Sequence, residues 1–366
     1  MNIKSLLIGS AAALVAVSGA RAADAIVAAE PEPVEYVRVC DAFGTGFFYI
    51  PGTETCLRID GYVRFRVGGV HERIGGVTVA GNDGYTHNTR VRINFDARSE
   101  TELGTLRGYM RLQSNSNAGV YVSGTDSVFG TDQAIIQLGG LFMGYTESAF
   151  AALWGGGVGN FGILTTDDGG SYGYHQTHQI GYRYDAGAWY AALVLQTDAA
   201  FNAPAPNWTP DVIGVIGTTW GGAAMHLGYD ETAKAVGIKG VVQFDVAATG
   251  GTLRVGGFYS NKAINRFGAG MPLGLAGEVA NWSGGIDYSQ GLTDTLAMSI
   301  GYQYLDGFST AKGGSIAHTH LVEGALSWTP VTDFNVRLEG HYKQGKSNLG
   351  VKGSSLDGFV WVRRSF

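Results

Sequence analysis

Apolar and polar residues alternate along many short segments of the chain. Between Leu57 and Val67 the apolar residues occupy every second position, and arginine, aspartate or tyrosine lies between them. The same arrangement recurs at 90–97, 106–113 and 334–343. A period of two is that of a β-strand, whose successive side chains point to opposite faces. Each segment is therefore predicted to be a strand with one apolar and one strongly polar face.

This alternation predicts about sixteen strands in all. They lie near 57–67, 90–97, 106–113, 132–139, 141–147, 178–185, 188–196, 212–220, 223–230, 236–246, 252–260, 280–289, 295–304, 317–328, 333–343 and 356–366. Short and long connections follow one another in turn, as at 99–104 and 114–131. Such an up-and-down sheet is typical of an outer-membrane barrel, whereas a lipocalin-like soluble barrel is apolar inside and has about eight strands. We therefore expect an all-β fold, a transmembrane 16-stranded antiparallel β-barrel over residues 57–366.

The first 22 residues have the features of a secretory signal peptide. Lys4 precedes the apolar stretch from Leu6 to Val17, and small residues surround an expected cleavage after Ala22. An N-terminal membrane anchor is the alternative, but the stretch is shorter than the roughly 20 residues that span a bilayer. No later apolar run reaches 18 residues. A mature chain in a membrane must then be a closed barrel, because only helices and barrels satisfy every backbone group there.

Composition narrows the class of protein further. The chain has 58 glycines and only 15% charged residues, against about 25% in an average protein, which disfavours a typical soluble enzyme. Its net charge is −6, from 25 basic and 31 acidic residues. Removing Lys4 and Arg21 with the signal peptide leaves 23 basic residues and a charge of −8. We expect no nucleic-acid partner, because such a partner requires a basic surface.

Residues 23–56 form a lead-in to the first predicted strand and contain both cysteines, Cys40 and Cys56. An even number of cysteines in an exported protein predicts one disulfide, and two free thiols are the alternative. The two positions lack the paired spacing of a zinc site. We expect neither a bound metal nor a cofactor.

Three segments of the sequence resemble a known family. They are VCDAFGTGFFYIPGTETCLRIDGYVRF at 39–65, SETELGTLRGYMRL at 99–112, and the terminal VRRSF. All three are similar to the alphaproteobacterial general porins of the Brucella and Rhizobium outer membrane. The resemblance implies a homotrimer, passive diffusion of small hydrophilic solutes, and a third external loop that folds inward as a constriction. It also implies that Phe366 belongs to the signal read by the barrel-assembly machinery, although Arg364 interrupts the apolar alternation there.

The connection at 148–177 has the position of that constriction loop. Long structureless connections in compact folds are usually functional, and the apolar residues of this one favour packing inside the barrel over a disordered external loop. Six arginines on the first three strands are candidates to face it: Arg64, Arg66, Arg90, Arg92, Arg107 and Arg111. The candidate acids of the constriction are Glu147, Asp167 and Asp168.

Arginines facing acids across a narrow pore would select solutes by charge; the alternative is that the arginines only solvate the lumen. The preferred ion is left open, because a basic wall favours anions and the acidic net charge attracts cations.

The sequence offers little for catalysis. His175 and His178, and His318 and His320, come without a third ligand at a convincing spacing for a metal. No GxSxG motif occurs, and GGGVGNFG lacks the helix and acidic residue of a dinucleotide site.

We therefore expect an outer-membrane porin of a Gram-negative bacterium, in contact with lipid and lipopolysaccharide, that catalyses no reaction. A barrel enzyme and a barrel adhesin or phage receptor are the alternatives.

Overall fold

The computed structural model describes residues 38–119, 129–166, 173–197, 208–271, 273, 278–308 and 316–366. The predicted signal peptide and residues 23–37 of the lead-in lie outside the described residues. None of the described helices has the length and apolar character needed to cross a membrane.

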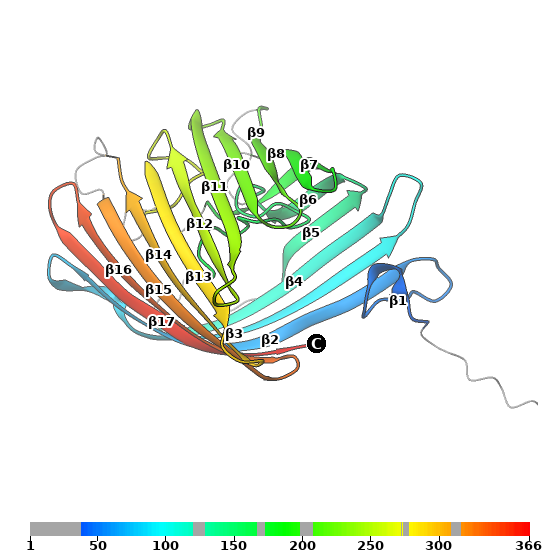
Figure 1. The fold of residues 1–366 in the computed structure, drawn as a ribbon, viewed down its shortest axis with the longest axis horizontal. Helices are drawn as coiled ribbons and strands as arrows, with labels where there is room; N and C mark the ends of the chain where they lie inside the picture. The colour runs from blue at the N-terminus through cyan, green and yellow to red at the C-terminus, as the bar shows by residue number, and fades with distance from the viewer. Residues whose placement is uncertain are drawn as a thin grey trace, which may run out of the picture. The chain divides into compact units, whose positions relative to one another are not determined.

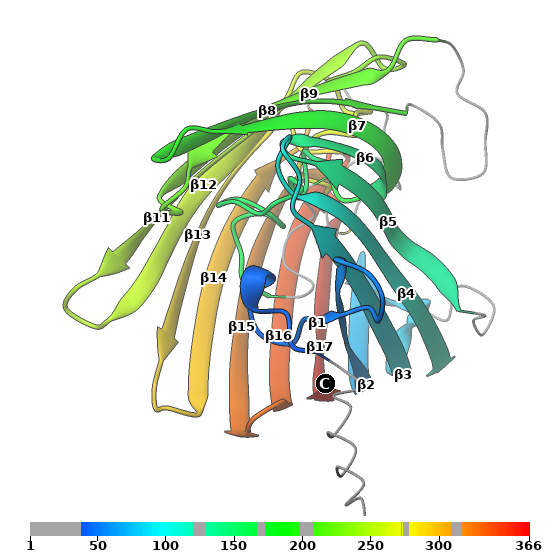
Figure 2. The same ribbon diagram turned by 90° about the vertical axis from the view of Figure 1, so that its right-hand side faces the viewer.

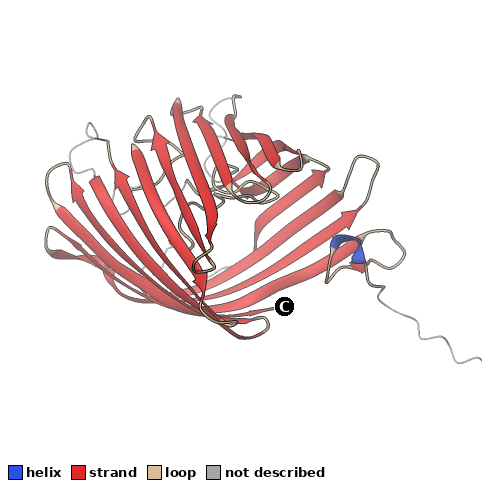
Figure 3. Ribbon diagram, in the orientation of Figure 1, coloured by secondary structure: helices blue, strands red, loops and turns tan. Residues whose placement is uncertain are grey.

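The regular secondary structure of the described chain is almost entirely strand (Figure 3). Besides the short 3-10 helix η1 (Asp41–Phe43), the elements are β1 (Phe48–Tyr49), β2 (Cys56–Ile74), β3 (Val77–Ser99), β4 (Leu106–Gly119), β5 (Gly130–Leu138), β6 (Leu141–Glu147), β7 (Gln176–Asp185), β8 (Trp189–Gln196), β9 (Asp211–Thr218), β10 (Ala223–Asp230), β11 (Ala235–Val246), β12 (Gly251–Ser260), β13 (Trp282–Gly291), β14 (Leu296–Asp306), β15 (Ile316–Val331), β16 (Phe334–Ser347) and β17 (Lys352–Ser365).

The strands β2 to β17 close into a barrel. Each pairs antiparallel with the next in sequence, and β17 pairs with β2 to complete the ring (Figures 1 and 2). These sixteen strands confirm the predicted fold. The two-residue strand β1 is an addition that pairs with the start of β2.

The two faces of the barrel follow the alternation of the sequence. On β2, Val63 and Phe65 point outward and are 46% and 48% exposed, whereas Arg64 between them is 7% exposed. A soluble barrel would have the opposite polarity, with apolar residues inside. An apolar outer wall around a polar interior is the arrangement of a barrel in lipid.

The hairpin of β2 and β3 is longer than the alternation predicts. Pairing continues to a turn at Gly75 and Gly76, whose φ angles of 60° and 84° suit glycine. Polar contacts hold its outer part, since His71 Nδ1 lies 2.8 Å from Asp83 Oδ1. Strand pairing therefore extends beyond the part of the hairpin that has an apolar face.

The predicted disulfide is present between Cys40 and Cys56, with their Cα atoms 5.9 Å apart. Both cysteines are buried beside Phe47. The backbone amide of Cys40 donates to the carbonyl of Phe47 at 2.9 Å. The disulfide thus ties the end of the lead-in to the first residue of β2.

The seam of the barrel closes at Phe366. Its backbone amide and carbonyl each form a 3.0 Å hydrogen bond with Gly61 of β2. Arg364, which breaks the apolar alternation of β17, lies 3.4 Å from Asp333 in the turn between β15 and β16. Both side chains are more than half exposed. The arginine therefore belongs to the rim of the barrel.

Among the described residues, two connections fold into the barrel, where the sequence predicted one. The predicted one follows β6, and residues 148–166 of it are described (Figure 1). The other joins β12 to β13 and includes Phe267, which is fully buried. The rings of Phe150 and Phe267 lie 5.2 Å apart and join the two connections. Residues 148–166 are called the constriction loop below.

Candidate channel constriction

The constriction loop is held to the inner wall by buried polar groups. Lys239 of β11 is fully buried, and its ammonium group donates to the carbonyls of Ala151 at 3.2 Å and Gly159 at 2.6 Å. His226 Nδ1 of β10 lies 3.1 Å from the carbonyl of Ala149. The loop is thus fixed by side chains of the barrel wall as well as by its own turns.

The loop also has internal structure. Asn160 bonds both the amide and the carbonyl of Leu153, each at 3.1 Å. The amide of Phe161, a residue with a positive φ of 60°, donates to the carbonyl of Ala151 at 2.8 Å. These bonds satisfy backbone groups that have no strand partner. The loop can therefore keep a defined shape in the lumen.

The far end of the described loop reaches the opposite side of the barrel. Thr165 donates from its amide and its hydroxyl to Asp287 of β13, at 3.3 and 3.1 Å. The hydroxyl of Thr166 donates to Glu323 of β15. Arg337 of β16 donates to the carbonyl of Thr165 at 2.9 Å. We call Asp287, Glu323 and Glu339 the acidic wall.

All three carboxylates of the acidic wall are 1–2% exposed. Glu339 accepts a hydrogen bond from Arg337, and the other two accept bonds from the loop threonines. These side chains are inward residues of strands, where a water-filled barrel normally exposes its charges. The loop and its neighbours instead separate them from the lumen.

Arginines gather on the wall formed by β17, β2 and β3. The pairing register places Arg363 opposite Arg64, and Arg64 opposite Arg90. On the next row, the guanidinium of Arg66 lies 3.6 Å from the ring centre of Phe359. We call Arg64, Arg66, Arg90 and Arg363 the arginine wall. Like charges directly opposite each other are destabilising unless something compensates them.

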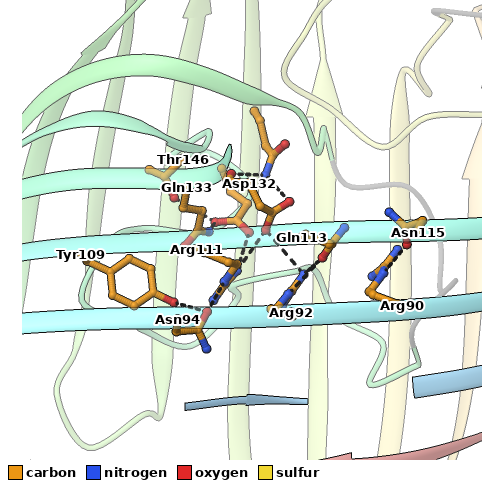
Figure 4. Close-up of polar contacts among 12 residues, drawn as sticks. Arg90, Arg92, Asn94, Tyr109, Arg111, Gln113, Asn115, Asp132, Gln133 and Thr146 are labelled. Atoms are coloured by element: carbon orange, nitrogen blue, oxygen red, sulfur yellow. Dashed lines mark hydrogen bonds and ion pairs between the residues drawn. The ribbon is translucent and has the colours of Figure 1, made fainter. Parts of the chain in front are cut away.

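A second group joins β3, β4 and β5 through alternating charges (Figure 4). Asp132 lies 3.5 Å from Arg92 and 3.6 Å from Arg111, and Arg111 lies 3.6 Å from Glu147. The pairing of β4 with β5 shifts at Asp132, so two residues of β5 oppose one of β4. Such a bulge re-aims a side chain, and here it brings an acid to the arginines.

Each predicted constriction residue in the described chain has a clear place. Arg64, Arg66 and Arg90 lie on the arginine wall, and Arg92 and Arg111 lie beside Asp132.

Arg107 lies apart from them, where it forms a two-pronged ion pair with Asp96 at 2.8 Å for both bonds. Glu147 lies on the same wall as Arg111, whereas the prediction placed it across the pore. Asp167 and Asp168 lie outside the described residues.

Sequence reasoning missed Asp132, Arg363, Lys239 and the acidic wall. Most of these residues occupy inward positions of strands whose boundaries were predicted well. A list of every charged residue at an inward position, taken over all sixteen strands, would have found them. Only the position of Asp132 depends on a bulge that the alternation does not reveal.

A cavity of about 690 Å³ lies along the arginine wall. Its lining includes Arg64, Arg66, Arg90 and Lys343 as basic residues and Glu72 and Asp357 as acids. Asp357 is 2.9 Å from Lys343 and 2.8 Å from His341. The remaining lining therefore has a positive excess.

Each histidine of the two sequence pairs packs against an aromatic ring. His175 lies in the connection before β7, where burial lowers its pKa to about 4, and its Nε2 is 2.9 Å from Gln196. His178 packs on the ring of Tyr145 at 5.1 Å. His318 and His320 pack with Tyr304. In the described residues no group of three or more His, Cys, Asp or Glu side chains could hold a metal ion.

A closed sixteen-stranded barrel that is apolar outside, charged inside and narrowed by an inward loop defines an outer-membrane channel. Comparison with known proteins gives the family. A family model described as "Porin subfamily" matches residues 24–357. Porin Omp2b of Brucella suis is 37% identical and that of Brucella canis 38% identical, each over the whole of both chains. The chain belongs to this porin family.

Solved structures show the same fold at low sequence identity. The outer-membrane channel DcaP of Acinetobacter baumannii has a TM-score of 0.65 and 12% identity, covering 87% of this chain and 99% of its own. OmpF of Salmonella typhi has a TM-score of 0.56 and 11% identity, covering 86% and 98%. The protein is therefore a porin of the Gram-negative outer membrane, a channel for passive diffusion.

Proposed function

We propose that this porin passes small hydrophilic solutes and prefers anions, because its arginines face the lumen while its acidic wall is covered. One observation carries the proposal: Asp287, Glu323 and Glu339 are 1–2% exposed and hydrogen-bonded, whereas Arg66 and Arg90 are partly exposed and line an open cavity. Charge acts most strongly on a permeating ion when it lines the pore. The negative net charge of the whole chain therefore does not decide the selectivity.

The narrowest part of the channel is proposed to lie between the constriction loop and the wall of β2 to β4. Arg92 and Arg111 project there with Asp132 and Glu147 beside them, so this section carries both signs of charge. Alternating charges orient water and disfavour apolar solutes, which must give up their hydration to enter. Size and polarity are thus selected here, and the arginine wall adds the preference for anions.

Solute flux into liposomes tests this proposal. Liposomes that contain the purified porin should swell faster in gluconate than in glucosamine, two solutes of similar size and opposite charge. Glucose, which is neutral, should lie between them. Equal rates for all three would leave a channel without charge preference, and faster entry of glucosamine would contradict the proposal.

The porin is further proposed to be a homotrimer, which the resemblance to general porins implies. The strand lengths support a contact between subunits on one side of the barrel. β6 has seven residues and β8, β9 and β10 have eight each, fewer than the 9–11 that span a bilayer at the usual tilt. Their outward residues are nevertheless apolar, such as Leu193, Ile216 and Met225. A neighbouring subunit would cover this side without requiring a full span.

Oligomer analysis checks this interface. Leu193→Cys should cross-link copies of the porin in detergent, whereas Leu338→Cys on β16 should not. Conductance should also rise in steps of three equal levels. Single-level steps and no cross-link at residue 193 would contradict the trimer.

The proposal also covers removal of the signal peptide and assembly of the barrel in the outer membrane. We infer cleavage after Ala22, which mass spectrometry of the membrane protein would show directly. We also infer that Phe366 is read by the barrel-assembly machinery, and its backbone pairing with Gly61 supports a role at the closing seam. Lipid and lipopolysaccharide are the proposed surroundings of the outer wall.

A further inference from the structure

The cavity along the arginine wall has more features than a channel needs for simple diffusion. We propose that it is a binding site for a small organic phosphate that carries hydroxyl groups, of the chemical class of sugar phosphates. The inference rests on the proposed anion preference but adds recognition, since a solute would pause at this site on its way through. Four properties of the lining support it.

The first property is the fixed placement of the cations. Arg64 and Arg90 of the lining lie opposite each other on the paired strands β2 and β3, and paired residues on neighbouring strands have Cα atoms about 5 Å apart. Guanidinium groups bind phosphate through two parallel hydrogen bonds. A phosphate group has enough oxygens to accept from two of these side chains.

The second property is the orientation of Arg66. Its guanidinium is stacked at 3.6 Å on the ring of Phe359, which limits the directions in which its hydrogens point. Stacked arginines keep their donors in the plane of the guanidinium and lose less freedom on binding. Arg66 is therefore prepared to donate to an oxyanion in the cavity.

The third property is a set of neutral polar groups beside the arginines. Asn88, Asn117, Thr86 and Ser355 line the same cavity. Asn88 donates to Asn117 at 2.7 Å, and its own carbonyl oxygen is buried without a hydrogen-bond partner among the described residues. A buried acceptor that is left without a donor costs free energy. A sugar hydroxyl set apart from the phosphate group would supply that donor while the phosphate oxygens accept from the arginines.

The fourth property is size. The cavity of about 690 Å³ lies within the 300–1,000 Å³ range of small-molecule sites. It is much larger than a bare phosphate ion, and a sugar phosphate would use both the cations and the amides. The two acids of the lining reduce its positive charge only in part. Asp357 is neutralised by Lys343 and His341, and Glu72 accepts a hydrogen bond from Asn82 at 2.6 Å.

Current blockade through the reconstituted, full-length mature porin tests the inference. Glucose 6-phosphate should reduce the open-channel current at a concentration roughly tenfold below that needed for inorganic phosphate, because the hydroxyls add hydrogen bonds worth about 1.4 kcal/mol together. Glucose should block more weakly still. Equal potency of glucose 6-phosphate and inorganic phosphate would overturn the inference, and so would the absence of any blockade.

A charge-preserving variant separates this site from simple anion preference. Arg64→Lys with Arg90→Lys keeps both positive charges but loses the planar forks, so blockade by glucose 6-phosphate should weaken roughly tenfold. Because the charges are kept, the reversal potential should keep the sign of anion permeation. Arg98→Lys on β3, an arginine that pairs with Asp96 outside the cavity, is the matched control and should leave blockade unaltered. If the double variant is blocked as well as the unmodified porin, no specific site exists, whereas a cation-selective reversal potential would instead refute the proposed function.

Discussion

The arginine wall and the acidic wall are built alike and placed differently. Both consist of charged side chains at inward positions of strands, on the neighbouring strands β17, β2 and β3 in one case and on β13, β15 and β16 in the other. The constriction loop donates to Asp287 and Glu323, but the arginine wall borders an open cavity. The comparison shows that the selectivity of a barrel depends on which charges its loop leaves accessible, and only secondarily on how many charges it has.

Reversing charge beside the open wall should have the largest effect. Arg90→Glu with Arg92→Glu changes the local charge by four units, and each unit acts on a passing ion with about 0.4 kcal/mol at about 10 Å in water. The permeability ratio of chloride to potassium should therefore fall roughly tenfold or more, as measured by the reversal potential in a potassium chloride gradient. Arg73→Glu on the exposed part of the β2–β3 hairpin is the control. An unchanged ratio in the double variant would place these side chains away from the narrow section.

Releasing the loop should have the next largest effect. Lys239→Met removes the ammonium group that bonds Ala151 and Gly159, and hydrogen bonds to charged groups contribute about 1.5–3 kcal/mol each. The loop should then leave the wall part of the time and uncover the acids.

Single-channel recordings of Lys239→Met should show added open-channel noise and a reversal potential shifted toward cations. The shift should be smaller than that of the arginine reversal. Lys234→Met, which changes a lysine in the turn between β10 and β11, should record like the unmodified porin. Recordings of Lys239→Met without added open-channel noise would show that the loop does not need this anchor.

Removing the bonds between the constriction loop and the acidic wall, without freeing the whole loop, should have a smaller effect. Thr165→Val with Thr166→Val keeps the shape of both side chains and removes the hydroxyl bonds to Asp287 and Glu323. We expect a modest cation-ward shift of the reversal potential. Thr89→Val, on the exposed outer face of β3, should produce none. A shift as large as that of Lys239→Met would mean that the threonines, and not the lysine, hold the loop in place.

Neutralising a covered acid should have the smallest effect. Asp287→Asn should leave the reversal potential almost unchanged, because its carboxylate is already separated from the lumen. Asp132→Asn is the informative counterpart, since Asp132 lies beside Arg92 and Arg111 and its loss should increase anion preference. The same measurement on both variants compares the two sides directly. If Asp287→Asn shifts the potential as much as Asp132→Asn does, the acidic wall is not covered.

The sequence allowed the strands to be predicted because the boundary between lipid and water lies at the wall of the barrel. Val63, Arg64 and Phe65 must then alternate in polarity, and the register follows from that requirement. The disulfide could also be predicted, since the exported chain has only Cys40 and Cys56.

The contacts across the lumen could not be predicted from the alternation of apolar and polar residues. Phe267 lies in a connection with no periodicity, yet it packs on Phe150 of another connection. Glu147 was expected across the pore from the arginines and lies beside Arg111 instead, because strand order brings β4, β5 and β6 together on one wall. Such placements depend on how the inner walls and loops meet in space, which the alternation along a single strand does not determine.

The reversal potential of the unmodified porin in a potassium chloride gradient tests the central claim most directly, since the two ions have nearly equal mobility in water. If the arginine wall sets the field in the lumen and the acidic wall is covered, the potential will take the sign of chloride permeation. A potential with the sign of potassium permeation would contradict this account.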